Sequence, residues 1–176
     1  KALVLPNMDT SSLPTSIELV EGNVLNPASL TKAMEGVETV FHCVGLIHPK
    51  KIKDLFTINV DGTRNMLEAA AKAGVKRFIY VSSNSAGGIN LTHDSLMKES
   101  DAPRPYLAYG RSKLAAEKLI QQYHDNGTLE TVILRPCWFY GPGRGQLHRC
   151  RQLWRGGLRV DCLQQRARQW FGRWFN

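Results

Sequence analysis

Residues 77–83 read Arg77-Phe78-Ile79-Tyr80-Val81-Ser82-Ser83, a short apolar run that ends in two serines. A run of this length, rich in β-branched and aromatic residues, is typical of a strand buried inside a sheet. The two serines would then stand where that strand ends. The stretch therefore predicts a buried strand that carries hydroxyl groups at its carboxyl end.

Helical and strand patterns alternate on both sides of this stretch. We expect strands within 1–5, 17–20, 39–43, 77–81 and 130–134, and helices within 27–35, 53–73 and 107–124. The first helix has Asn26 as its candidate cap, Pro27 at its first position and Gly36 at its end. The alternation predicts parallel strands joined by helical crossovers, hence an α/β fold with a doubly wound sheet. Ligands of such sheets bind beyond the carboxyl ends of the strands.

Charge and cysteine spacing exclude several classes of function. The net charge of the 176 residues is +8, but residues 1–143 contribute only +1 and residues 144–176 contribute +7. We therefore expect no nucleic-acid interface in the body of the protein. The four cysteines form no Cys-x-x-Cys pair, so we expect reduced thiols and no metal site. No apolar run is long enough to cross a bilayer.

Tyr109 and Lys113 stand four residues apart in an expected helix, which places them on one face about a turn apart. A free tyrosine has a pKa of about 10, and a nearby cation stabilises its phenolate. Such a phenol can exchange a proton with a carbonyl or an alcohol. The bare pattern is usually a packed ring and a solvated charge, but here it follows the strand that ends at Ser83.

Seven segments, taken in order, resemble one known family. They are Gly22-Asn23-Val24, residues 40–45, residues 59–63, residues 78–83, residues 109–113, Leu134-Arg135-Pro136 and residues 140–143. Over about residues 1–143 the chain resembles the extended short-chain dehydrogenase/reductases, in their NAD-dependent epimerase/dehydratase and 3β-hydroxysteroid dehydrogenase-like branch. The resemblance implies a Rossmann-type doubly wound parallel sheet with NAD or NADP as cofactor.

The resemblance also implies catalytic roles. It makes Tyr109 the general acid/base and Lys113 the residue that assists it and binds the nicotinamide ribose. It makes Ser83 the hydroxyl that orients the substrate oxygen. Ser82 competes for that role, and Ser83 has the alternative reading of a turn or helix cap.

Further residues are implied to bind the cofactor. Besides Tyr109 and Lys113 they are Asn23, Val24, Cys43, Val44, Gly45, Asn59 and Pro136. Asn23 stands where the family has Asp, although an amide oxygen can still accept from adenine; its alternative reading is a turn residue. We interpret Asn59 first as a structural link between the long helix and a strand. His42 is expected to be a core histidine, and His48 and His93 are expected in loops.

The chain departs from the family in two places. The glycine-rich turn that cradles the pyrophosphate is absent, so we expect an incomplete sheet without its first strand. The 176 residues alone should then bind cofactor weakly or not at all. Residues 144–176 hold eight Arg and three Trp but no Lys or Glu, so we expect an atypical second region after a first region of 1–143. A shifted reading frame near Gly143 is the favoured explanation, and a basic aromatic surface for RNA or acidic lipid is the alternative.

The sequence thus predicts an NAD(P)-dependent oxidoreductase or epimerase acting on a secondary alcohol, a ketone or a nucleotide sugar. The alternative is a non-catalytic binding protein or inactive remnant. We expect a small-molecule substrate as partner, a homodimer as the candidate assembly, no membrane association and a cytoplasmic location.

Overall fold

Parallel strands alternate with the helices that connect them in the computed structural model, which describes residues 1–11, 13–89 and 96–137. Two sheets are present within these residues. The strands are β1 (Ala2–Val4), β2 (Leu19–Glu21), β3 (Thr39–His42), β4 (Arg77–Val81) and β5 (Glu130–Leu134). Strands β1 and β2 pair with each other, and β3, β4 and β5 pair in that order, all in parallel. The expected parallel arrangement is confirmed.

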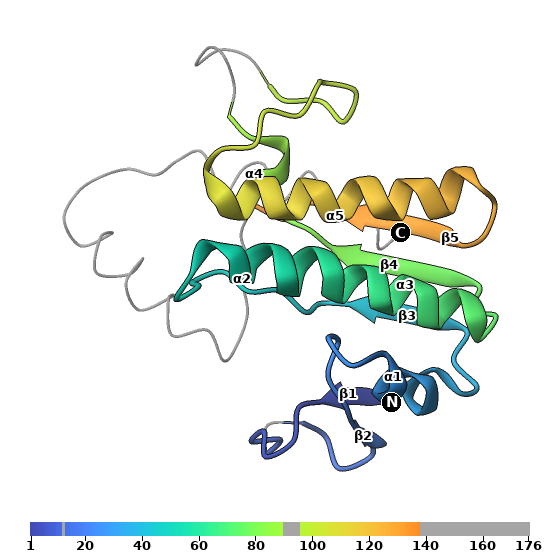
Figure 1. The fold of residues 1–176 in the computed structure, drawn as a ribbon. Coiled ribbons are helices and arrows are strands. Elements are labelled where there is room, and N and C mark those ends of the chain that lie inside the picture. Colours follow the sequence, from blue (N-terminus) through green and yellow to red (C-terminus); the bar gives the residue numbers. More distant parts are fainter. Residues whose placement is uncertain (12, 90–95, 138–176) are drawn as a thin grey trace. The chain divides into compact units, whose positions relative to one another are not determined.

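The helices fall between the strands, as the alternation predicted. They are α1 (Pro27–Met34), α2 (Ile52–Phe56), the π-helical turn η1 (Thr57–Asp61), α3 (Gly62–Lys72), α4 (Asn84–Gly87) and α5 (Leu107–Asp125). Helices α3 and α5 lie side by side across one face of the β3–β4–β5 sheet (Figure 1). None of the helices in the described part of the chain is long and apolar enough to cross a membrane.

The core lies between that sheet and its helices. Phe78 and Tyr80 of β4 are fully buried, and Leu67 of α3 and Ile120 of α5 pack into the same cluster. Removing each of these side chains from water stabilises the fold by about 1.5–3 kcal/mol. This packing fixes where α5 crosses the sheet, and α5 carries the predicted catalytic pair.

The other face of the sheet carries apolar side chains that no described residue covers. Phe41, Ile79 and Val132 stand in register across the three strands. Phe41 is 68% exposed and Val132 is 38% exposed. In α/β proteins both faces of such a sheet are covered, so the part of the fold that the structure describes is partial on this face.

Three local expectations need correction. The strand expected at 17–20 begins only at Leu19, because the Ile17 amide bonds to the Pro14 carbonyl in a turn. The Asn26 side chain does not cap α1; the Ser29 hydroxyl instead bonds to the backbone of Asn23 and Asn26. The helix expected at 53–73 is interrupted by η1.

Several sequence segments fall outside the described residues, and their predictions stay untested. These are His93, the segment 140–143, Cys150, Cys162 and the region 144–176.

Candidate active site at the strand ends

Lys113 places a buried positive charge where β3 and β4 end. Its side chain is only 2% exposed, and Nζ donates to the carbonyl oxygen of Val81, the last residue of β4, at 2.8 Å. A Cβ built on Gly45 would lie 3.5 Å from Nζ, so the ammonium also lies beside the segment that follows β3. This is the edge of the sheet where the sequence predicted a ligand.

Tyr109 stands one turn before Lys113 in α5, about 6 Å back along the helix axis. Its side chain is half-buried. Its backbone carbonyl accepts a hydrogen bond from the Ser112 hydroxyl at 2.8 Å. The hydroxyl of Ser112 in turn accepts from Nδ2 of Asn59 at 2.9 Å. The turn that carries the tyrosine is therefore anchored to a neighbouring element.

Asn59 provides that anchor from the π-helical turn. It is 1% exposed, accepts from the Leu46 amide at 2.7 Å and donates to the Leu46 carbonyl at 3.0 Å. One amide side chain thus joins the loop after β3, the turn η1 and helix α5. These contacts agree with the structural interpretation of Asn59, and π-helical turns often occur at functional sites.

Gly110 sets how closely α5 approaches the end of β4. A Cβ at this position would lie 2.3 Å from the carbonyl oxygen of Ser85, which is far inside contact distance. Ser85 lies in the short helix α4, directly after Ser83. Glycine between Tyr109 and Lys113 therefore lets the start of α5 pack directly on the chain that follows the predicted substrate-binding serine.

The two serines at the end of β4 have different surroundings. Ser82 is 4% exposed, and its hydroxyl donates to the carboxylate of Glu117. Glu117, itself buried, is also held by Arg135, with Nε–Oε1 at 3.0 Å and Nη2–Oε2 at 2.6 Å. The hydrogen bond to Glu117 raises the pKa of the Arg135 guanidinium. The Ser82 hydroxyl is therefore part of a buried hydrogen-bond network with Glu117 and Arg135.

Ser83 is half-buried and caps α4, because its Oγ accepts from the Ser85 amide at 3.2 Å. This cap uses a lone pair of the oxygen and not the O–H, which donates to Oδ1 of Asn84 at 3.3 Å and would exchange that partner for a substrate oxygen. The capping interpretation and the catalytic interpretation of Ser83 are compatible. Of the two serines, Ser83 is the one with the freer hydroxyl.

Burial lowers the pKa values of two groups at this edge of the sheet. It lowers the pKa of Lys113 to about 8, against a smaller upward contribution from Glu117 and Cys43. Burial also lowers the pKa of His42 to about 3, and the charge of Lys113 acts in the same direction. His42 is 1% exposed with Nε2 2.9 Å from the Thr63 hydroxyl, so it is the core histidine that the sequence predicted. His48 is exposed.

The residues predicted to bind cofactor are only partly accessible. Cys43, Val44 and Gly45 follow β3 and are exposed, and the Pro136 carbonyl accepts from the Asn84 amide beside Ser83. Asn23 is exposed, but its Oδ1 accepts from the Leu25 amide in a turn, while Val24 is buried in the core. Cys43 and Cys137 are both free thiols.

The donors at this edge fit the ribose end of a nicotinamide nucleotide. The Lys113 ammonium has three donors. Among the described residues its one hydrogen bond is to Val81. Two donors therefore remain for ribose hydroxyls. The exposed segment 43–45 offers backbone groups next to them.

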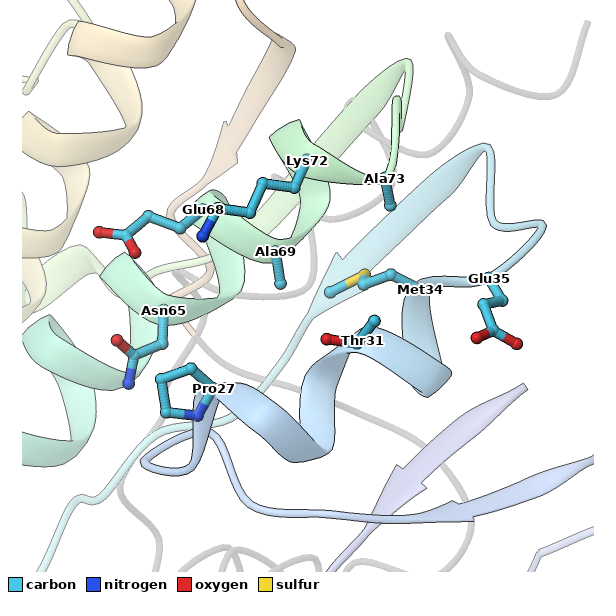
Figure 2. Close-up of a pocket in the computed structure, with 9 residues that line it drawn as sticks. All are labelled: Pro27, Thr31, Met34, Glu35, Asn65, Glu68, Ala69, Lys72 and Ala73. Atoms are coloured by element: carbon cyan, nitrogen blue, oxygen red, sulfur yellow. The ribbon is translucent and has the colours of Figure 1, made fainter.

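A cavity of about 320 Å³ lies elsewhere, between α1 and α3 (Figure 2). Its floor includes Met34 and Ala69, and its rim includes Glu35, Glu68 and Lys72. None of the predicted catalytic or cofactor-binding residues lines it. The predicted site at the strand ends is therefore separate from this cavity.

Sequence reasoning missed Tyr80, Ser112 and Glu117 as parts of this edge. Glu117 follows Lys113 by one helical turn, a spacing that would have placed both on one face. Ser112 lies on the buried side of α5, which its position between the charged residues Arg111 and Lys113 did not reveal. The Tyr80 ring contacts Nζ of Lys113, which lies 4.2 Å from the ring centroid, and nothing in the sequence indicated this contact.

Comparisons with known proteins point to one family. Residues 3–156 match the NAD dependent epimerase/dehydratase family. The chain is 36% identical over 148 residues to the uncharacterized protein y4nL of Sinorhizobium fredii, covering 82% of this chain and 42% of that protein. It is 32% identical over 141 residues to a decarboxylating sterol-4-alpha-carboxylate 3-dehydrogenase of Candida albicans, covering 76% and 39%.

Among solved structures, MoeE5 in complex with UDP-glucuronic acid and NAD is similar with a TM-score of 0.67 and 32% identity. That similarity covers 82% of this chain and 48% of MoeE5. The chain thus spans roughly two fifths to a half of the length of these proteins. The expected Rossmann-type fold is confirmed by structures of this kind.

Proposed function

The chain belongs to the NAD-dependent epimerase/dehydratase family, and from that membership we propose that the whole protein is an NAD-dependent oxidoreductase or epimerase acting on a secondary alcohol or ketone. The observation that carries the proposal is the buried ammonium of Lys113 at the ends of β3 and β4, one helical turn from Tyr109. Burying an ammonium costs free energy, so such a group is uncommon unless it has a function.

In this proposal three side chains have different roles in the reaction. The Ser83 hydroxyl orients the substrate oxygen, and the Tyr109 phenol exchanges a proton with it. The Lys113 ammonium stabilises the phenolate form of the tyrosine. Bound NAD supplies the hydride acceptor or donor for the reacting carbon. Ser82 takes no part, because Glu117 holds its hydroxyl.

We further propose NAD as the cofactor in preference to NADP. The residues that would hold it are Asn23, the segment 43–45, Lys113 and Pro136. NADP would need a cation for its 2′-phosphate. Lys1, just before β1, is instead engaged elsewhere, because its Nζ donates to the Glu35 carbonyl at 3.0 Å and lies 3.5 Å from Glu18. Without the glycine-rich turn, the 176 residues alone should bind NAD weakly.

The relatives support a substrate with a hydroxyl or ketone on a ring. The sterol carboxylate dehydrogenase is named for action at such a position, and MoeE5 was crystallised with a nucleotide sugar. The proposed substrate of this protein is therefore a small molecule of either class. The Ser83, Tyr109 and Lys113 chemistry serves both.

Tyr109→Phe in the whole protein tests the proposal. With ring alcohols, reduction of NAD is followed by absorbance. With nucleotide sugars, the epimeric product is also followed by chromatography, because an epimerase returns the hydride and leaves no net reduced NAD. Loss of the phenol should lower turnover by about 10²- to 10⁴-fold and leave NAD affinity within about threefold. Tyr123→Phe is the matched control, since it removes a phenol about 20 Å further along the same helix.

Two results would contradict the proposal. Turnover of Tyr109→Phe equal to that of Tyr123→Phe would remove Tyr109 from the mechanism. A whole wild-type protein that binds NAD but turns over no substrate of either class would favour the alternative, a non-catalytic binding protein.

A further inference from the structure

The Lys113 ammonium rests on the face of the Tyr80 ring, and the family resemblance assigns no role to this residue. Nζ lies 4.2 Å from the centroid of the Tyr80 ring. Tyr80 is completely buried in β4, and its carbonyl neighbour Val81 accepts the lysine's hydrogen bond. The two contacts come from consecutive residues of one strand, so the strand holds the ammonium from two directions.

The charged form of Lys113 needs such contacts, because burial favours its neutral form. The titratable and charged groups around it come from three elements. They are His42 and Cys43 at the end of β3, Tyr80 of β4, and Tyr109 and Glu117 of α5. Glu117 favours the ammonium, but it is shared with Ser82 and Arg135. The face of an aromatic ring is electron-rich and attracts a desolvated cation.

The Tyr80 ring is itself fixed from its strand neighbours. The His42 ring stacks on it with centroids 5.6 Å apart and an angle of 25° between the ring planes. His42 is held through Nε2 by the Thr63 hydroxyl. The low pKa of His42 keeps that ring neutral, so it does not repel the ammonium.

We propose that Tyr80 is a positioning residue whose ring face keeps the Lys113 ammonium charged and directed to the ends of β3 and β4. The catalytic consequence of this interaction rests on the proposed function, but the interaction itself does not. The effect is ascribed to the ring and not to the hydroxyl, because the ring face is what Nζ meets, 4.2 Å from the centroid.

A series of phenylalanines at position 80 tests this proposal with little change of shape. Fluorine withdraws electron density from the ring face, so mono-, di- and pentafluorinated phenylalanine should weaken the attraction step by step. The titration of Lys113 is followed by NMR of isotope-labelled lysine side chains, with its signal assigned by Lys113→Met. Tyr80→Phe should leave the Lys113 pKa unchanged, and the pentafluorinated ring should lower it by about one pH unit.

Tyr80→Leu provides a second variant that removes the ring. It should lower the Lys113 pKa by a similar amount, provided that circular dichroism shows a folded chain. If Tyr80→Leu does not fold, the fluorinated series alone decides. A Lys113 pKa that is independent of fluorination, or that rises with it, would overturn the proposal.

This titration is independent of turnover. A pKa that falls with fluorination, in a protein that transfers no hydride, would support the role of Tyr80 and refute the proposed function. If the Lys113 pKa does not change with fluorination, but Tyr109→Phe inactivates the protein, the role of Tyr80 is refuted and the proposed function stands.

Discussion

Replacing Gly110 with alanine should move the start of α5 away from α4, the short helix that follows β4. The added methyl would lie 2.3 Å from the Ser85 carbonyl oxygen and 3.1 Å from its carbonyl carbon. An ordinary carbon–oxygen contact is more than 3 Å, so the start of α5 must move by roughly 1 Å. Both atoms that it meets belong to backbone, which cannot rotate away as a side chain would.

The expected cost follows from two opposing effects. Overfilling a packed interface destabilises a protein by about 1–3 kcal/mol. Alanine normally improves on glycine inside a helix by about 1 kcal/mol, which offsets part of this cost. Because the clash is with backbone, the upper end of that range applies, and we expect Gly110→Ala to lower the free energy of unfolding by about 2 kcal/mol. The shift of Tyr109 relative to Ser83 should lower turnover of the whole protein by about 100-fold.

Urea unfolding followed by circular dichroism measures the stability, and Arg111→Ala is the control. Arg111 is the next residue of α5 and is exposed, so its replacement should change the free energy of unfolding by less than about 0.5 kcal/mol. A Gly110→Ala protein as stable as the wild type, or more stable, would refute the argued close packing of α5 on α4.

Two further predictions concern the sheet and its buried histidine. Phe41 and Phe78 lie on neighbouring strands and on opposite faces of the β3–β4–β5 sheet. Phe41 is 68% exposed, so Phe41→Ser should lower the free energy of unfolding of the 176-residue chain by less than about 1 kcal/mol. Phe78 is fully buried, so Phe78→Ala should lower it by about 3–5 kcal/mol, as measured by urea unfolding. His42 stays neutral when folded and takes up a proton when unfolded, so stability should fall as the pH drops below 6.5. Between pH 6.5 and about pH 4.5 this loss should be about 2 kcal/mol, and His42→Gln should remove it; equal acid sensitivity of the variant would show that other groups are responsible.

The elements with a clear apolar pattern in the sequence were predictable. The strands at 77–81 and 130–134 have the expected bounds, and α5 differs from its prediction by one residue. Long amphipathic or wholly apolar segments determine their own structure, because only one arrangement buries them. The one-turn helix α4 was not predicted, since a four-residue element has no measurable periodicity.

The candidate site was predictable only where a motif marks it. Tyr109, Lys113 and Ser83 were selected by spacing and resemblance, and the structure places the backbone of all three at the same edge of the sheet. Tyr80, Ser112 and Glu117 act through contacts between elements distant in the sequence. Local pattern carries no information about such contacts, so only the packed fold reveals them.

Lys113→Met in the whole protein tests the central claim, that an ammonium at the strand ends makes Tyr109 a usable proton carrier. The quantity to measure is the ratio of wild-type to variant kcat/KM from about pH 7 to pH 10, with the exposed Lys118→Met as control. If the lysine acts through its charge, this ratio should shrink by at least about tenfold over this range. In the wild type, Lys113 loses its proton near pH 8 and with it the advantage of its charge. In the variant, the phenol gains activity as it ionises near pH 10. A ratio that stays constant with pH would contradict the claim.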